Sequence, residues 1–126
     1  MKCAIVDTHA IIWYILRNRQ LGKKAQAMFD STDTQLIVPT IVLCELWAYF
    51  RKSHTIERYD TVFQAMQEDT RFKIHPLTVD LIPDIPLELE LHDGLIVATF
   101  LQYSNAVILS KDEKIKQWGP HHLVWN

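Results

Sequence analysis

Residues 2–8 read KCAIVDT, and this stretch decides the fold. Small and β-branched apolar residues run without a break and end at the carboxylate of Asp7. An unbroken apolar run of this kind is typical of a strand buried on both faces, as the central strands of parallel sheets are. Asp7 then lies at the carboxyl end of a central strand, which is the edge where open α/β sheets bind their ligands.

The composition is that of an ordinary globular domain. Of 126 residues 48% are apolar and 22% charged, and 13 basic against 15 acidic side chains leave a net charge of −2. We expect one domain over residues 1–126, without a broad basic surface for nucleic acid. The sequence has neither an apolar span nor a leader segment, which predicts a cytoplasmic protein with no membrane association. Cys3 and Cys44 are then expected to be buried free thiols.

Strands and helices alternate along the chain, which predicts an α/β fold with a parallel sheet. Further strands are expected at residues 35–38, 72–77, 106–109 and 123–125. The strand at 72–77 is closed by Pro76 and is expected at an edge of the sheet. Helices are expected at residues 8–19, 23–29, 41–52, 55–69, 79–85, 92–103 and 113–118. The 41–52 helix is apolar nearly all round, so we expect it to be buried on most sides.

Four acidic residues occupy positions that suit a shared site: Asp7, Glu45, Asp93 and Asp112. Asp7 and Asp112 each follow a buried strand, and the apolar spacing after Asp93 places it on the core-facing stripe of its helix. Each of these three has an ordinary alternative role as a helix cap or a partner of the helix dipole. Glu45 lies in the middle of an apolar helix, where the alternative is an ion pair with Arg17 or Arg19.

Carboxylates that crowd together repel one another, and each raises the pKa of its neighbours. A divalent cation among them removes that repulsion. Oxygen ligands favour Mg²⁺ or Mn²⁺ over Zn²⁺, and the sequence has no Cys/His pair at zinc spacing. The grouping therefore predicts a magnesium or manganese site.

These motifs resemble those of PIN-domain nucleases, and among them the VapC-like toxins of bacterial type II toxin–antitoxin modules. The resemblance is carried by IVDTHAIIW at 5–13, VLCEL at 42–46, HDGLIVAT at 92–99 and LSKDEKI at 109–115. It covers the whole chain, including its length and the order of the motifs. It implies a PIN-like three-layer α/β sandwich whose five-stranded parallel sheet has the order 3-2-1-4-5, so that Asp7 and Asp112 would be neighbours.

The resemblance also implies an endoribonuclease that cleaves structured RNA such as tRNA or rRNA, forms a homodimer and is inhibited by a cognate antitoxin protein. Its catalytic and metal-binding residues would be Asp7, Glu45, Asp93 and Asp112. Thr8 and Ser110 would orient these side chains, and the candidates for substrate contact are Lys111, His92 and His9.

The sequence departs from the family pattern at two positions. Gly94 stands where many relatives carry Arg, so a contact to the site or to RNA is in doubt there. Ser110 stands where Thr is commoner, which keeps the hydroxyl. Neither departure removes a predicted metal ligand.

Other functions fit parts of the pattern. A phosphatase with an aspartate nucleophile needs a second carboxylate two residues after Asp7, where this chain has His9. A receiver domain needs an acidic pair at the end of the first strand, and Asp7 stands alone. A PIN fold with a weak or silent site would act as an RNA- or protein-binding module, and a housekeeping RNA-processing nuclease would share every motif.

Overall fold

The computed structural model describes residues 2–126 and contains a five-stranded parallel sheet. The strands are β1 (Lys2–Val6), β2 (Thr34–Pro39), β3 (Phe72–His75), β4 (Ala106–Leu109) and β5 (Leu123–Val124). Their spatial order is β3-β2-β1-β4-β5, with Ile5 of β1 aligned to Ile37 of β2 and Ile108 of β4. The expected order and the edge position of the third strand are confirmed.

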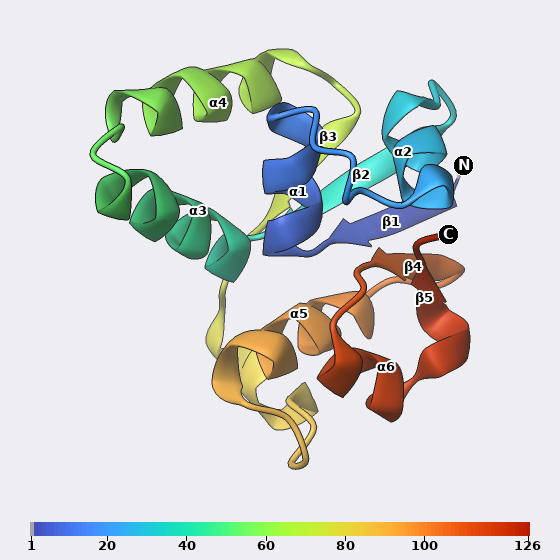
Figure 1. The fold of residues 1–126 in the computed structure, drawn as a ribbon. Coiled ribbons are helices and arrows are strands. Elements are labelled where there is room, and N and C mark those ends of the chain that lie inside the picture. Colours follow the sequence, from blue (N-terminus) through green and yellow to red (C-terminus); the bar gives the residue numbers. More distant parts are fainter. Residues whose placement is uncertain (1) are drawn as a thin grey trace.

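Helices cover both faces of the sheet and complete a three-layer sandwich (Figure 1). One face carries α1 (Thr8–Ile15), α2 (Lys23–Asp30), α3 (Thr40–Lys52) and α4 (Glu57–Glu68), and the other carries α5 (Leu91–Phe100) and α6 (Glu113–Trp118). Short 3₁₀ helices, η1 (Val79–Asp84) and η2 (Pro120–His122), precede α5 and β5. Right-handed crossovers explain the division, because connections that run in opposite directions along a sheet place their helices on opposite faces.

The core is built around β1 and α5. Ala4, Ile5 and Val6 of β1 are fully buried, as the unbroken apolar run predicts. α5 is buried over residues 94–100, so packing holds both the strand that ends before Asp7 and the helix whose first turn carries Asp93. Despite this apolar character, none of the helices within residues 2–126 has the length and hydropathy to cross a membrane.

The first helix is shorter than predicted. α1 ends at Ile15 rather than at Arg19, because the backbone turns at Arg17, which has a φ of 54°. The turn returns the chain to the core at Leu21, which is buried. Arg17 and Arg19 are therefore exposed residues of a loop and do not lie in the last turn of a helix.

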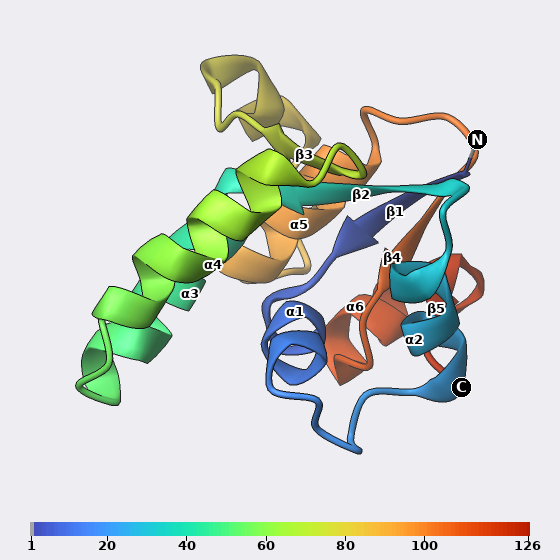
Figure 2. The same cartoon turned by 90° about the horizontal axis from the view of Figure 1, so that it is seen from above.

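The third helix is less buried than predicted. Only one face of α3 is buried, by the side chains of Val42, Leu43, Leu46 and Phe50. Cys44, Trp47 and Tyr49 are exposed. The reason is tertiary: α3 and α4 project together beyond the sheet, where no further layer covers them (Figure 2). The prediction of a buried thiol is therefore wrong for Cys44, while Cys3 is half-buried.

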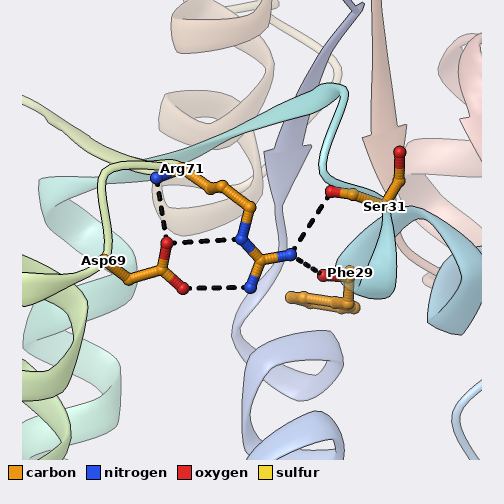
Figure 3. A network of polar contacts seen from close by, with 4 residues as sticks. All are labelled: Phe29, Ser31, Asp69 and Arg71. Atoms are coloured by element: carbon orange, nitrogen blue, oxygen red, sulfur yellow. Dashed lines mark hydrogen bonds and ion pairs between the residues drawn. The ribbon is translucent and has the colours of Figure 1, made fainter.

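Arg71 ties the start of β3 to the end of α2 (Figure 3). Its guanidinium donates to the Asp69 carboxylate at 2.9 and 3.3 Å and to the main-chain carbonyl oxygens of Phe29 and Ser31. The hydrogen bonds from Arg71 hold the pKa of Asp69 below its usual value. This network anchors the edge strand on the side away from the predicted site.

Candidate active site

A cavity of about 300 Å³ at the carboxyl edge of the sheet brings the four predicted acidic residues together. Asp7 follows β1 and Asp112 lies just beyond β4, while α3 supplies Glu45 and the first turn of α5 supplies Asp93. β1 and β4 are neighbours, and the Asp7 N–H donates to the Leu109 carbonyl oxygen at 3.2 Å, which extends their pairing to the rim of the cavity.

Asp7 is the most deeply placed of the four, with 8% of its surface exposed. The hydroxyl of Ser110 donates to its Oδ2 at 2.5 Å. Burial raises the pKa of Asp7 and the charge of Asp112 adds to the rise, while the Ser110 hydrogen bond opposes it. Asp7 occupies the N-cap position of α1, but its side chain makes no capping hydrogen bond. The helix-cap interpretation of this residue is therefore not what the structure shows.

Asp112 combines a cap with a place in the cavity. Its Oδ1 accepts from the N–H groups of Lys114 and Ile115 at 2.8 and 3.0 Å, which caps α6. Its own N–H donates to Oγ of Ser110 at 3.0 Å. The ordinary role predicted for this carboxylate is thus present, and the same side chain lines the acidic cavity.

Glu45 lies at the border between the buried and exposed faces of α3, with 31% of its side chain exposed. Thr8 Oγ1 donates to its Oε1 at 2.7 Å, and Nδ1 of His92 lies 3.5 Å from its Oε2. Within residues 2–126 neither Arg17 nor Arg19 forms an ion pair with it. The alternative of an arginine partner is therefore wrong, and Glu45 opens onto the cavity instead of lying embedded in apolar surroundings.

The pKa of Asp93 is affected by the other three acidic residues of the cavity. Its pKa is raised to about 6, first by burial and then by the negative charges of Asp112, Asp7, Glu45 and Glu90. The other three acids of the cavity thus act on Asp93 in the same direction. Burial and the neighbouring carboxylates therefore both favour the protonated form of Asp93 when no cation is bound.

The donor set fits a hard divalent cation that keeps part of its water shell. As the side chains are placed, no three His, Cys, Asp or Glu residues of the described chain are arranged to hold one ion together. Glu45 and Asp112 are also engaged, by Thr8 and by the start of α6. Mg²⁺ commonly binds through one or two carboxylates and retains several waters, which suits oxygen ligands spread around a cavity.

The remaining predicted residues lie at or beside this cavity. Thr8 and Ser110 contact the acidic side chains directly, and His9 lines the cavity. His92 lies beside Glu45 with 60% of its side chain exposed. Lys111 lines a neighbouring cavity, where its ammonium stands 4.6 Å from the ring centroid of Trp13.

Sequence reasoning left other cavity residues without a specific role there. Tyr49 and Lys52 line the acidic cavity. Lys52 follows Glu45 by seven positions, which places both on the same face of a helix. Trp13 and Trp125 line the neighbouring cavity. Trp125 directly follows β5 and so stands at the same sheet edge as Asp7, a strand-end position that could have identified it.

The sheet order and the acidic carboxyl edge define an α/β protein of the kind that places its chemistry at strand ends. The family model of the PIN domain matches residues 4–119. The chain belongs to the PIN domain family, as its motifs indicated. Proteins of this family are in general nucleases that use divalent metal ions.

Comparison with solved structures agrees on the fold. VapBC2 from Rickettsia felis bound to a DNA fragment from their promoter matches with a TM-score of 0.73 and 16% identity, over 98% of this chain and 99% of that one. A toxin–antitoxin complex from Klebsiella pneumoniae matches with a TM-score of 0.69 and 19% identity, over 96% of this chain and 95% of that one. The PIN domain endonuclease Utp24 matches with a TM-score of 0.52 and 20% identity, over 91% of this chain and 74% of that one. No curated protein matches the sequence.

Proposed function

We propose that this protein is a metal-dependent endoribonuclease that cleaves phosphodiester bonds of structured RNA such as tRNA or rRNA. One observation carries the proposal: carboxylates from four separate elements line one cavity, where the charges of three of them help raise the pKa of the fourth, Asp93, to about 6. An arrangement of this kind is unfavourable by itself and becomes favourable around a cation.

The acidic side chains would hold Mg²⁺ or Mn²⁺, and the residues behind them set their positions. A bound cation lowers the pKa of a coordinated water and stabilises negative charge on the phosphate. The Ser110 hydroxyl fixes Oδ2 of Asp7, and the Thr8 hydroxyl fixes Oε1 of Glu45. Hydrogen bonds of this type hold ligand side chains in position for an ion.

Basic side chains at the rim would receive the RNA phosphates. Lys52 lines the acidic cavity, and Lys111, directly before Asp112 in the sequence, lines the neighbouring cavity. Because the chain as a whole has a net charge of −2, phosphate binding depends on such local positive charge rather than on an extended basic surface. His9 and His92 add donors at the same rim.

The test is cleavage of a panel of tRNA and rRNA fragments in Mg²⁺, in Mn²⁺ and in EDTA. We expect cleavage with either metal and none in EDTA. Asp93→Asn should abolish it, while Glu88→Gln, which removes an exposed acid of the preceding segment, should leave it unchanged. Cleavage that survives EDTA or Asp93→Asn, or the absence of cleavage of every RNA with metal present, would contradict the proposal.

A catalytically silent PIN module that binds RNA or protein is the second candidate. The observation that favours it is that no three potential ligands among the described residues are arranged around one ion. The two functions separate in the same assay, because a silent module retains RNA in a gel-shift experiment with metal present and leaves it uncut.

We propose further that the protein is the toxin of a type II toxin–antitoxin pair, acts on RNA in the cytoplasm as a homodimer and is inhibited by a cognate antitoxin. Two solved structures that match nearly the whole chain are described as toxin–antitoxin assemblies. Val79, Ile82 and Leu87 are 84%, 60% and 101% exposed. Exposed apolar side chains of this kind are typical of partner surfaces.

Expression in a bacterial host tests this role. Growth should stop on induction and resume when the small reading frame next to the gene is expressed with it, and light scattering should give a dimer for the purified chain. A housekeeping RNA-processing nuclease would cleave RNA without arresting growth.

A further inference from the structure

We propose that the cavity next to the acidic site binds a nucleobase by stacking on Trp13, with His9 and Trp125 as its other aromatic walls. We call it the base cavity; it is lined by Asp7, His9, Ala10, Trp13, Lys111, Asp112 and Trp125. The inference rests on the proposed function, because the base would belong to the RNA whose phosphate lies at the acidic site.

The base cavity has the position and size for a single base. It shares Asp7, His9 and Asp112 with the acidic cavity, so the two are directly adjacent. Its volume is about 230 Å³. This is below the range of about 300–1,000 Å³ that is usual for sites of drug-sized ligands. It suits one planar ring system whose ribose phosphate extends to the neighbouring carboxylates.

Aromatic side chains from opposite ends of the chain form the walls. His9 and Trp13 lie one turn apart on α1, with ring centroids separated by 5.5 Å. Trp125 meets the Trp13 ring edge-on, with centroids 5.8 Å apart and planes at 64°. The Trp125 carbonyl oxygen accepts from the N–H groups of Lys24 and Ala25, both at 3.0 Å, which ties this wall to the start of α2. The walls are thus set in place before any ligand enters.

Lys111 is placed to bind the phosphate of a nucleotide whose base enters the base cavity. Its ammonium stands over the Trp13 ring at 4.6 Å, and its side chain is exposed. A cation over an aromatic ring is a weak contact at an exposed site, whereas an ammonium and a phosphate attract each other strongly. An incoming nucleotide therefore draws the ammonium to its phosphate and frees the ring face of Trp13 for the base. Stacking of this kind tolerates any base sequence.

The experiment compares two short RNA probes. One is an oligouridylate, and the other is an oligomer of the same length whose riboses carry no base. Binding is measured by fluorescence anisotropy in Mg²⁺ with the Asp7→Asn chain, in which we expect no cleavage. Trp13→Leu in that background should weaken oligouridylate binding by about fivefold to about a hundredfold, and should leave binding of the base-free probe unchanged.

Trp47→Leu is the matched control. Trp47 resembles Trp13 in having a cation over its ring, Arg51 at 5.4 Å, but Trp47 is exposed and lines neither cavity. We expect it to change neither affinity. The inference is overturned if Trp13→Leu leaves oligouridylate binding unchanged, if it weakens both probes equally while circular dichroism shows a native fold, or if the parent chain prefers neither probe.

If Trp13→Leu fails to fold, Trp125→Leu provides a second test of the base cavity. Trp125 follows the short edge strand β5, so its replacement leaves unchanged the helix α1 that carries Trp13. We expect a smaller preference for the base-bearing probe, and an unchanged preference overturns the inference. Neither binding measurement depends on cleavage. If the chain prefers the base-bearing probe but cuts no RNA, the base-cavity inference stands and the nuclease proposal is refuted.

Discussion

Ser110 donates a hydrogen bond of 2.5 Å to Oδ2 of Asp7, although 103 positions separate the two residues in the sequence. The same hydroxyl oxygen accepts the N–H of Asp112 at 3.0 Å. One small side chain thus links the acidic residues that follow two adjacent strands, and it does so from a buried position with 1% of its surface exposed. The predictions below start from this link and move outward.

Removal of the Ser110 hydroxyl should impair activity more than folding. In Ser110→Ala, Oδ2 of Asp7 and the Asp112 N–H both lose a partner, so the acidic side chains are less well oriented. We expect RNA cleavage to fall by about tenfold to a hundredfold in kcat/KM. Ser110→Thr keeps the hydroxyl and should retain most activity. Equal activity of the Ala variant and the parent would show that the hydrogen bond does not position the site.

Asp7→Asn should remove cleavage and preserve the fold. The amide keeps the shape of the side chain and takes away a negative charge whose burial raises the pKa of Asp7. We expect activity to fall by more than about a hundredfold, since the change affects a proposed ligand rather than its support. The melting temperature in EDTA should be unchanged or higher. A fully active Asp7→Asn chain would refute the assignment.

The contribution of Asp93 to the stability of the metal-free protein should fall as the pH rises from about 4 to about 7. The pKa of Asp93 in the folded chain is about 6 against an ordinary value of 3.8, so the folded state binds this proton more tightly than the unfolded state. The stability that Asp93 contributes is therefore fully present below its ordinary pKa, and it is lost as the pH rises through its pKa in the folded chain. The raised pKa of Asp7 acts in the same direction.

The Asp93→Asn chain isolates this contribution in a series of melting temperatures in EDTA. The lowered pKa values of His75 and His122 give the opposite slope in part of this range, and both chains share them. As the pH rises, we expect the melting temperature of the wild type to fall relative to that of Asp93→Asn. Added Mg²⁺ should stabilise the wild type more at pH 7 than at pH 5. A constant difference across the range would contradict the prediction.

Gly94 should resist substitution for a steric reason. It lies buried in α5, and a Cβ added there would stand 2.5 Å from Cγ2 of Ile85. Gly94→Ala should therefore cost up to about 2 kcal/mol, because overpacking exceeds the gain in helix propensity. Ile85→Ala in the same chain removes the clashing methyl group and should reduce the penalty for the second substitution. Chemical denaturation of the four chains measures this, and a fully additive pair would contradict it.

Much of the fold was predictable from local pattern. The apolar run that ends at Asp7 predicted a central buried strand, and Pro76 predicted an edge strand at residues 72–77. Both features depend on the chain itself: an apolar run needs cover on two faces, and proline lacks the N–H that an inner strand donates. The grouping of four acids at one cavity was also expected, while their role as metal ligands stays a prediction.

The sequence by itself determined the strands and the acidic character of one sheet edge, because these follow from periodicity and from residues at strand ends. The sheet order was expected only from the resemblance of the motifs to those of PIN-domain nucleases. Only the tertiary structure decided that α3 exposes Cys44 and Trp47, and that Trp125 meets Trp13 beside Asp7. Periodicity shows how apolar a helix is, but the elements packed against it decide which face is covered. Contacts between the two ends of a chain depend on how the whole sheet assembles, and no local pattern contains that information.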